Sequence, residues 1–439
     1  MIDRIHIKGY KSLRDVEVEL EPLTVLFGPN AAGKSNFLDA LQLLSRMITS
    51  ETLKDAFEPP YRGKPLESFS FPPGGIGELL QQESARFSIE VDMTLSRKLV
   101  DRVNREISEL RKPHGEREQG EEGTGTSPRV REHRLRYMVE VQIRPQSGIL
   151  EVTNELLAPL TAKGKVSGSR NAFIERSKKS HRLHLRMEKQ SHPRYFDLGL
   201  DHTVLSRPLY APHHPHAVAA QKEMASWMFC YFEPRERMRA PSPVKEVRHI
   251  GLMGEELAPF LNTLYNTDTV RFRGVERALK SIIPSIEGIS VQVNQSGEVE
   301  LRLQEGECLV PASVVSEGTL RILGILSLRA ADKSPAVIGF EEPENGVHPR
   351  RIGLIAELMK SIPSGGDTQL IVTTHSPILP NSIPDDSLFV CSKDDASTGI
   401  TRFKTWGPLG RDEAIEDGLQ VTDEGSPASV RILRGDFDA

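Results

Sequence analysis

Apolar and polar positions alternate or cluster along the first 50 residues in a way that predicts strands followed by a helix. Residues 4–8 and 16–20 alternate as half-buried strands do, with a turn at residues 9–13 between them. Residues 23–27 are continuously apolar, which is typical of a strand buried on both faces. Residues 37–44 then place apolar side chains at helical spacing. The pattern predicts a strand pair that leads into a buried strand and a helix.

The middle of the chain is dominated by alternation. Residues 87–93, 135–143 and 150–153 predict a meander of antiparallel strands, and residues 97–110 have helical spacing. Residues 112–128 are polar, rich in glycine and without periodicity, so we expect a mobile, poorly ordered loop there.

The second half returns to alternating helices and strands. Residues 217–232 predict a helix that ends before Pro234, and the Pro- and Arg-rich residues 233–243 read as a boundary between two halves. Further segments predict helices at 255–265 and 275–282, strands at 289–293 and 299–303, and two C-terminal strands at 387–392 and 400–406. Residues 336–340 and 369–373 are continuous apolar runs of the parallel-sheet type.

Composition narrows the class of protein. The net charge is −5 and the isoelectric point is near 6.3, so nothing in the overall charge favours nucleic acid. Cys230, Cys308 and Cys391 are too far apart for a zinc knuckle or a disulfide framework. The N-terminus has no signal-peptide core, and no apolar run reaches membrane-spanning length. We therefore expect a cytoplasmic protein without a membrane partner.

The strongest chemical signal lies between the buried strand and the first helix. Gly28-x4-Gly33-Lys34-Ser35 matches a phosphate-binding loop in the strand–loop–helix context that such loops require, which outweighs a chance glycine-rich turn. Backbone N–H groups and the helix N-terminus would surround a polyphosphate. Lys34 would reach the β- and γ-phosphates, and the Ser35 hydroxyl would lie on Mg²⁺.

Three further motifs follow in a fixed order. Ser316 begins a helix with Gly318 beside it, which exposes N–H groups to an anion. Glu341 and Glu342 end one buried strand, where paired carboxylates can hold a metal-bound water and polarise an attacking water. His375 follows the next buried strand, at the edge where a γ-phosphate would lie. Each motif alone is an ordinary turn, but the set downstream of a phosphate loop is not expected by chance.

The motifs carry a family resemblance. Residues 28–35, 316–319, 337–343 and 373–377 resemble the Walker A, signature, Walker B and H-loop motifs of RecF/SMC-type ABC ATPases. Residues 341–349 look like the standalone ATPases related to the OLD (overcoming lysogenization defect) proteins, many of which belong to bacterial anti-phage systems. The resemblance covers 1–95 and 235–405 well and 96–234 only loosely.

The resemblance implies an α/β fold: an ABC-type ATPase head with a mixed or parallel central sheet, an antiparallel β subdomain and a helical or irregular insertion. It divides the chain into an N-terminal ATPase lobe (1–95), an insertion with the meander and a basic segment (96–234), and a C-terminal ATPase lobe (235–439).

The resemblance also implies roles for single residues, with ATP and Mg²⁺ as the ligands. The residues expected to hold ATP are Gly28, Asn30, Gly33, Lys34, Ser35 and Asn36. Glu341 would join Ser35 at Mg²⁺, Glu342 would be the catalytic carboxylate, and His375 would sense the γ-phosphate. Ser316, Glu317 and Gly318 would contact ATP on a second subunit, which implies an ATP-dependent head-to-head homodimer and leaves higher oligomers open.

This chain departs from the family pattern at several positions. Ala31 replaces a common glycine, Glu341 stands where an aspartate is usual, and Glu317 occupies a position often held by Gly or Asp. Candidates for the Q-loop glutamine are Gln81, Gln82 and Gln142.

Two segments have uncertain chemistry. The basic residues between 163 and 194 suit either phosphate contact or a solvated sheet face, with neither favoured. His213, His214 and His216 lack a nearby carboxylate or cysteine at ligand spacing, so a metal site there is disfavoured.

Several functions compete. A transporter ATPase is set aside because 282 positions separate Lys34 from Ser316. A self-contained OLD-like nuclease is disfavoured because the 64 residues after His375, with Asp394-Asp395 and residues 436–438, do not build its acidic metal-binding domain. A RecF-type DNA repair ATPase remains an alternative. The favoured hypothesis is a dimeric ATPase that controls a separate nuclease or toxin in a DNA-linked or anti-phage process.

Overall fold

A computed structural model describes residues 1–111, 128–167, 172–177, 182–188, 194–331, 334–393 and 401–405, the last by backbone alone. The chain forms two compact units, each built from separate segments of sequence. Unit 1 comprises residues 1–20, 39–227 and 393–403, and unit 2 comprises residues 21–38, 228–392 and 404–439. The predicted mobile loop, apart from Pro128, and the acidic residues at 394–395 and 436–438 lie outside the described residues.

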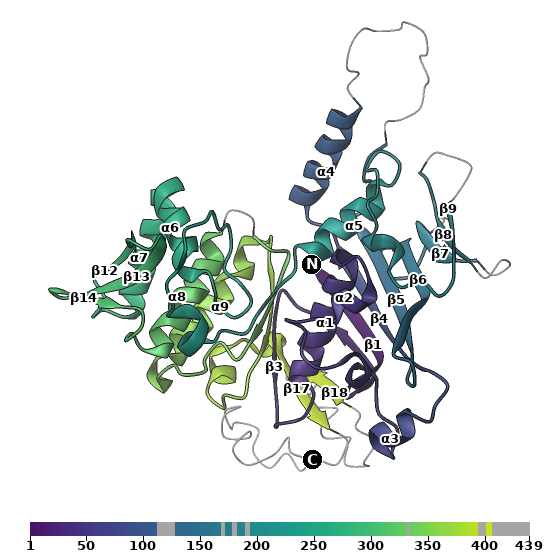
Figure 1. Ribbon diagram of the computed structural model, residues 1–439, viewed down its shortest axis with the longest axis horizontal. Coiled ribbons are helices and arrows are strands. Elements are labelled where there is room, and N and C mark those ends of the chain that lie inside the picture. Colours follow the sequence, from purple (N-terminus) through teal and green to yellow (C-terminus); the bar gives the residue numbers. More distant parts are fainter. Residues whose placement is uncertain are drawn as a thin grey trace, which may run out of the picture. The chain divides into compact units, whose positions relative to one another are not determined.

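Unit 2 is organised around the parallel strands of a six-stranded sheet whose order is β10-β15-β16-β3-β17-β18; Figure 1 labels β3, β17 and β18. Its strands are β10 (Met228–Cys230), β15 (Val337–Glu341), β16 (Gln369–Thr373), β3 (Leu23–Phe27), β17 (Leu388–Lys393) and β18 (Thr401–Thr405). Neighbours from β10 to β17 pair in parallel. All five side chains of β3, β15 and β16 are buried, as their continuous apolar sequence predicts.

Helices complete the core of unit 2. They are the first turn of α1 (Lys34–Thr49), α6 (Leu257–Thr267), α7 (Thr269–Ile282), α8 (Glu317–Ala330) and α9 (Ile352–Ser361). Leu320, Leu323 and Ile355 from α8 and α9 join Phe340 and Val372 of the sheet in one apolar cluster. Helix α8 is buried along nearly its whole length. The residues around its N-terminus are therefore held by a rigid core.

A small antiparallel sheet is formed by strands that come before and after helices α6 and α7 along the chain. It contains β11 (Ser242–Pro243), β12 (Gly288–Val293), β13 (Glu298–Glu305) and β14 (Cys308–Pro311). Ile289 pairs with Leu303, and alternate residues of β13 are buried, so one face packs on the core and the other faces solvent.

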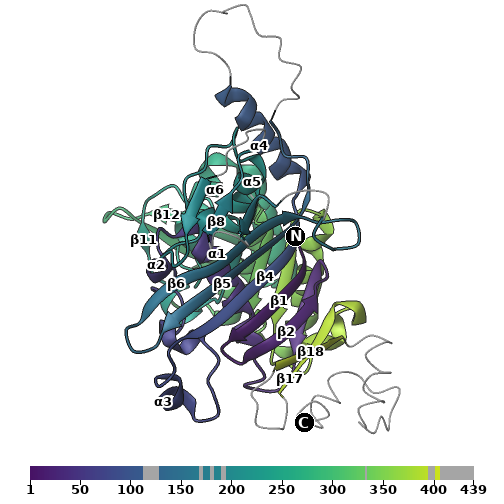
Figure 2. The ribbon, with the colours of Figure 1, turned by 90° about the vertical axis from the view of Figure 1, so that its right-hand side faces the viewer.

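Unit 1 contains an antiparallel sheet of eight strands in the order β2-β1-β4-β5-β6-β7-β8-β9 (Figure 2). The strands are β1 (Ile2–Tyr10), β2 (Leu13–Glu19), β4 (Ala85–Thr94), β5 (Arg134–Arg144), β6 (Ile149–Pro159), β7 (Ile174–Arg176), β8 (Arg182–Leu185) and β9 (Arg194–Asp197). One face buries Ile5, Ile89 and Val139 from successive strands, which confirms the predicted meander. Its helices are the rest of α1, α2 (Leu53–Ala56), α3 (Gly75–Leu79), α4 (Arg97–Leu110) and α5 (Pro215–Ala225).

The predicted fold class is confirmed, but the helix predicted at 217–232 is wrong in its second half. Helix α5 ends at Ala225, and Met228–Cys230 forms strand β10, which pairs in parallel with residues 338–340 of β15. The short apolar run Met228-Phe-Cys230 suits either conformation, and its strand partner lies more than a hundred residues away. Among the described residues, no helix has both the length and the apolar character needed to cross a membrane.

Candidate functional site: a phosphate loop facing two carboxylates and a histidine

Three functional segments leave the sheet of unit 2 at the same level. Glu341 of β15 is paired with Thr373 of β16, and Thr373 is paired with Leu26 of β3. Because parallel strands present their carboxyl ends at one edge, the phosphate loop, Glu342 and His375 emerge together. The phosphate loop and the carboxylates, which lie some three hundred residues apart in the sequence, therefore meet at one edge of the sheet.

The phosphate loop depends on backbone conformations that favour glycine. Gly28 and Gly33 have φ of 142° and 99°. A Cβ on Gly28 would lie 2.1 Å from the carbonyl oxygen of Cys391, so no side chain fits there. Ala31 also adopts a left-handed φ of 63°, which explains why glycine is common at this position in related loops.

Lys34 lies across this loop. Its Nζ donates hydrogen bonds to the carbonyl oxygens of Gly28, at 2.7 Å, and Pro29, at 2.6 Å. Burial lowers the pKa of Lys34 to about 8, although the nearby Cys391 and Glu342 act in the opposite direction. The Lys34 ammonium is buried among backbone groups and has lost its contacts with water. A phosphate anion bound beside it would offset this loss by direct electrostatic attraction.

Ser35 and Glu341 meet directly. The Ser35 hydroxyl donates to Oε1 of Glu341, although the two residues are 306 positions apart. Glu341 is buried at the end of β15, and its longer side chain still reaches the serine. A hydroxyl and a carboxylate oxygen are hard ligands of the kind that Mg²⁺ prefers, so the donor set fits this ion.

Glu342 has an unusual backbone and two polar neighbours. Its φ of 46° lies in the left-handed region, which costs a non-glycine residue about 1–2 kcal/mol. His375 Nε2 lies 3.4 Å from Oε1 of Glu342, and Asn345 Nδ2 donates to Oε2 at 3.3 Å. Burial, followed by the charge of Lys34, lowers the pKa of His375, so the neutral imidazole prevails at neutral pH. Strain held at such a carboxylate is typical of a catalytic position.

A third carboxylate, which received no role in the sequence analysis, supports the histidine. Glu344 is buried and accepts a hydrogen bond from the Thr374 hydroxyl, which in turn accepts one from the backbone N–H of Ser376 at 2.9 Å. Burial raises the pKa of Glu344. This chain of contacts ties the segment after β15 to the segment that carries His375.

Arg321 is a second residue that the sequence analysis missed. Its guanidinium donates to the carbonyl oxygens of Glu342 and Phe232, both at 3.0 Å. Only 5% of Arg321 is exposed, and burial lowers its pKa. A single charge within an otherwise apolar helical run was the available sequence signal. Arg321 connects helix α8 to the ends of β10 and β15.

The signature residues occupy different environments. Ser316 caps helix α8: its Oγ accepts from the N–H of Thr319 at 3.2 Å, and the residue is exposed. Gly318 is buried, and a Cβ there would lie 2.7 Å from the carbonyl oxygen of Gly346. The glycine therefore permits close packing against the segment after Glu342, while the serine faces outward. Contact with a second subunit stays a prediction.

The remaining candidates lie in simpler surroundings. Asn30 is exposed on the phosphate loop, and Asn36 is half-buried in the first turn of α1. The three Q-loop candidates all belong to unit 1, where Gln142 accepts a hydrogen bond from Arg86 at 2.7 Å.

Of the histidines at 213–216, His216 has a structural role in unit 1. The Nδ1 of His216 lies 2.7 Å from Glu188, and its Nε2 accepts from the N–H groups of Arg131 and Glu132, both at 2.9 Å. The ring also stacks on Phe173 at 4.4 Å. Both ring nitrogens are thus engaged, and the described part of the chain holds no cluster of three or more potential metal-ligand side chains.

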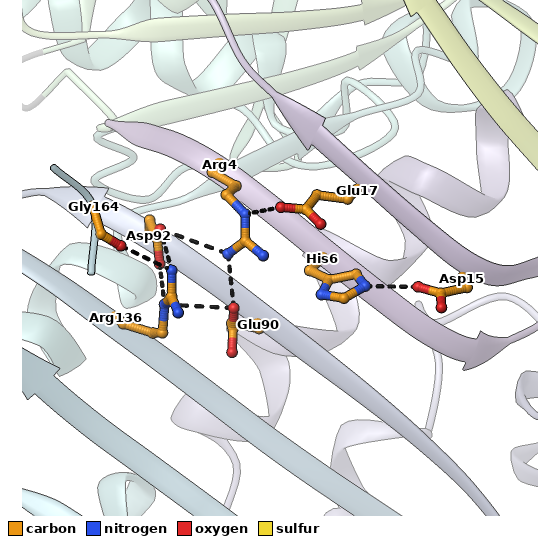
Figure 3. Close-up of polar contacts among 8 residues, drawn as sticks. All are labelled: Arg4, His6, Asp15, Glu17, Glu90, Asp92, Arg136 and Gly164. Atoms are coloured by element: carbon orange, nitrogen blue, oxygen red, sulfur yellow. Dashed lines mark hydrogen bonds and ion pairs between the residues drawn. The ribbon is translucent and has the colours of Figure 1, made fainter. Parts of the chain in front are cut away.

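The basic segment carries partly neutralised charges. Arg182 pairs with Asp197 at 2.7 Å, and Arg186 lies 3.7 Å from Glu175. On the polar face of the same sheet, Figure 3 shows Arg4 and Arg136 surrounded by carboxylates. Arg136 binds both oxygens of Asp92, at 2.6 and 2.7 Å. The charges of Arg182 and Arg186 are thus partly neutralised, and nucleic-acid contact by the segment stays a prediction.

Comparisons with known sequences match two parts of the chain. Residues 1–112 match a family described as "AAA ATPase domain", and residues 262–379 match one described as "AAA domain, putative AbiEii toxin, Type IV TA system". A stretch of 44 residues is 41% identical to the OLD nuclease of Thermus scotoductus (strain ATCC 700910 / SA-01). That stretch is 10% of this chain and 8% of the OLD nuclease.

Comparisons with solved structures match most of the chain. The SMC head bound to the C-terminal winged-helix domain of ScpA is 13% identical, with a TM-score of 0.52 over 93% of this chain and 99% of that one. The Smc head with an extended coiled coil, bound to the C-terminal domain of ScpA from Pyrococcus furiosus, is 11% identical, with a TM-score of 0.49 over 95% and 98%. The first of these likenesses shows a shared fold. Taken with the sequence matches, it supports the resemblance to SMC/RecF-like ABC ATPases related to the OLD proteins.

Proposed function

We propose that this protein binds and hydrolyses ATP at the edge of the parallel sheet in unit 2. The observation that carries the proposal is the contact between Ser35 and Glu341, with Glu342 and His375 beside it. The Ser35 hydroxyl of the phosphate loop and the Glu341 carboxylate at the end of β15 are in direct contact. A metal ion bound to phosphate needs two such oxygen ligands close together. When bound there, Mg²⁺ would supply positive charge for the β- and γ-phosphates.

The residues of the chain divide the chemistry among them. Lys34 binds the phosphates, and Glu342 orients and polarises the attacking water through the carboxylate that Asn345 holds in place. The neutral imidazole of His375 donates a hydrogen bond toward the γ-phosphate. Ser316, exposed at the start of α8, binds the γ-phosphate of ATP on a second copy, which makes a head-to-head dimer the hydrolysing form.

The ATP-dependent dimer is proposed to control a separate effector, a nuclease or toxin, in a DNA-linked or anti-phage process. One matched family is described as a putative toxin of a Type IV TA system, and the similar SMC head binds ScpA, so the second precedent joins such a head to a partner protein. A second candidate is an intrinsic nuclease, which the local identity to the OLD nuclease favours. Metal-dependent DNA cleavage by the purified protein that survives Lys34→Ala would establish this second candidate.

The hydrolysis proposal is tested by steady-state ATP turnover of the wild-type protein and two variants. Lys34→Ala removes the phosphate ligand and should abolish nucleotide binding and turnover. Glu342→Gln keeps the size of the side chain and should retain ATP binding while slowing turnover by roughly a hundredfold or more. The same variant should accumulate as an ATP-bound dimer. Wild-type turnover by Glu342→Gln would contradict the assignment of the catalytic carboxylate.

A further inference from the structure

The signature turn is surrounded by arginines from the segment that precedes β11. A π-helical turn at Pro234–Met238 carries Arg235, whose Nε donates to Oε1 of Glu317 at 2.5 Å. One turn on, Arg239 donates to the carbonyl oxygen of Val315 at 2.8 Å. Residues that the sequence analysis treated as a simple boundary therefore hold the two residues that flank Ser316.

Glu317 places a negative charge where an anion is expected to bind. It is the first residue of α8, directly after the exposed Ser316. A carboxylate is stabilised at a helix N-terminus, yet the same N–H groups and dipole attract phosphate. The Arg235 guanidinium, hydrogen-bonded to this carboxylate, lowers the pKa of Glu317, so the carboxylate stays ionised at all physiological pH values. An incoming phosphate therefore meets this charge unless a cation neutralises it.

We propose that Arg235 is a positioning residue that neutralises Glu317 and so allows the N-terminus of α8 to accept the γ-phosphate of ATP bound to a second copy of the chain. The Arg235–Glu317 pair thus acts as a charge gate on dimer closure. The proposal rests on the proposed head-to-head dimer and adds the residue pair that controls its affinity. The side chain of Arg235 is 79% exposed, so an approaching surface can reach it.

The chain offers a matched control on the same turn. Arg237 lies two residues from Arg235, is also exposed and carries the same charge, but among the described residues it is Arg235, not Arg237, that pairs with Glu317. Arg237→Ala removes one positive charge from the same short segment. It therefore separates the specific neutralisation of Glu317 from a general effect of net charge.

The test measures the dimer dissociation constant in ATP and Mg²⁺ by analytical ultracentrifugation, with Glu342→Gln as the parent so that ATP persists. Four derivatives of this parent are compared with it. They carry Arg235→Ala, Glu317→Gln, both of these substitutions, or Arg237→Ala. Arg235→Ala should weaken dimerisation by roughly tenfold or more, because Glu317 then repels the phosphate. Glu317→Gln should not weaken it, and the double variant should return to within about threefold of the parent. Arg237→Ala should remain close to the parent.

Two further readouts separate a charge gate from a structural role. Binding of a fluorescent ATP analogue to the isolated copy should be unchanged in every variant. The defect of Arg235→Ala should shrink as salt is raised, because salt screens exposed charges.

Three outcomes would overturn the gate. A double variant as weak as Arg235→Ala would mean that the arginine acts on the phosphate itself. Unchanged dimerisation in Arg235→Ala would mean that the pair is only structural. If the parent forms no ATP-dependent dimers, both the proposed function and the gate are overturned. If the parent dimerises and Arg235→Ala dimerises equally well, only the gate is overturned.

Discussion

At the scale of single residues, the site combines a cation with a lowered pKa and a strained carboxylate. Lys34 is desolvated within the phosphate loop, and its ammonium is satisfied by two backbone carbonyls. Glu342 is held at positive φ close to His375. Both features raise the free energy of the nucleotide-free chain locally, and an anion bound beside Lys34 would offset the desolvation of its ammonium.

The pKa of Lys34, about 8 in the free protein, predicts that nucleotide binding depends on pH. Bound phosphate raises this pKa, so the protonated amine is the binding form and affinity is constant well below pH 8. Above pH 8 the affinity should fall, by roughly tenfold at pH 9, with uptake of a proton on binding. Isothermal titration calorimetry in buffers of different ionisation enthalpy measures both quantities.

Lys34→Arg provides the control for this pH dependence. An arginine keeps its charge throughout this range, so any binding that the variant retains should be independent of pH between 7 and 9. A wild-type affinity that stays flat to pH 9 without proton uptake would show that Lys34 is already fully protonated in the free protein.

The sequence allowed the phosphate loop, the two carboxylates and the histidine to be predicted because each follows a buried strand at a fixed local spacing. Arg321, Glu344 and Arg235 could not be assigned in the same way. Their partners are Glu342, Thr374 and Glu317, and tertiary packing alone brings these together. Local patterns reveal which residues lie at a strand end, but they do not reveal which side chains meet there.

At the scale of elements, helix α8 is connected through its first two turns to the sheet edge that carries Glu342. Gly318 packs against the segment after Glu342, and Arg321 bonds the carbonyl oxygens at the ends of β10 and β15. The strands were predictable because parallel central strands are continuously apolar. Strand β10 was missed because three apolar residues specify neither helix nor strand until β15 pairs with them.

Replacement of Arg321 should therefore affect stability and catalysis together. Arg321→Met preserves apolar bulk but leaves two carbonyl groups without their donor, which should reduce the free energy of unfolding by about 2–4 kcal/mol. ATP turnover should fall because the backbone of Glu342 loses its support. Denaturant unfolding and steady-state turnover measure the two effects.

Arg321→Lys is the matched variant for this prediction. It retains the charge but cannot bond both carbonyl oxygens with one forked group, so its stability and turnover should lie between those of wild type and Arg321→Met. Wild-type stability and turnover in Arg321→Met would show that the two hydrogen bonds support neither the fold nor the site.

At the scale of the whole molecule, each compact unit is assembled from separate segments of the chain. Unit 2 alone contains the phosphate loop, the carboxylates, His375 and the signature turn. The division into 1–95, 96–234 and 235–439 stays a prediction, as do the Q-loop residue and the partner of the basic segment. The central claim is that the phosphate loop of one copy works with the signature turn of another.

Mixing two inactive variants tests this claim directly. Lys34→Ala disables the phosphate loop, and Ser316→Arg blocks the signature turn, so each should be inactive alone. In a head-to-head dimer of one with the other, one site combines both defects and the second site is intact. An equimolar mixture should then recover about a quarter of wild-type ATP turnover if copies pair at random. A mixture as inactive as its components would contradict a site shared between two copies.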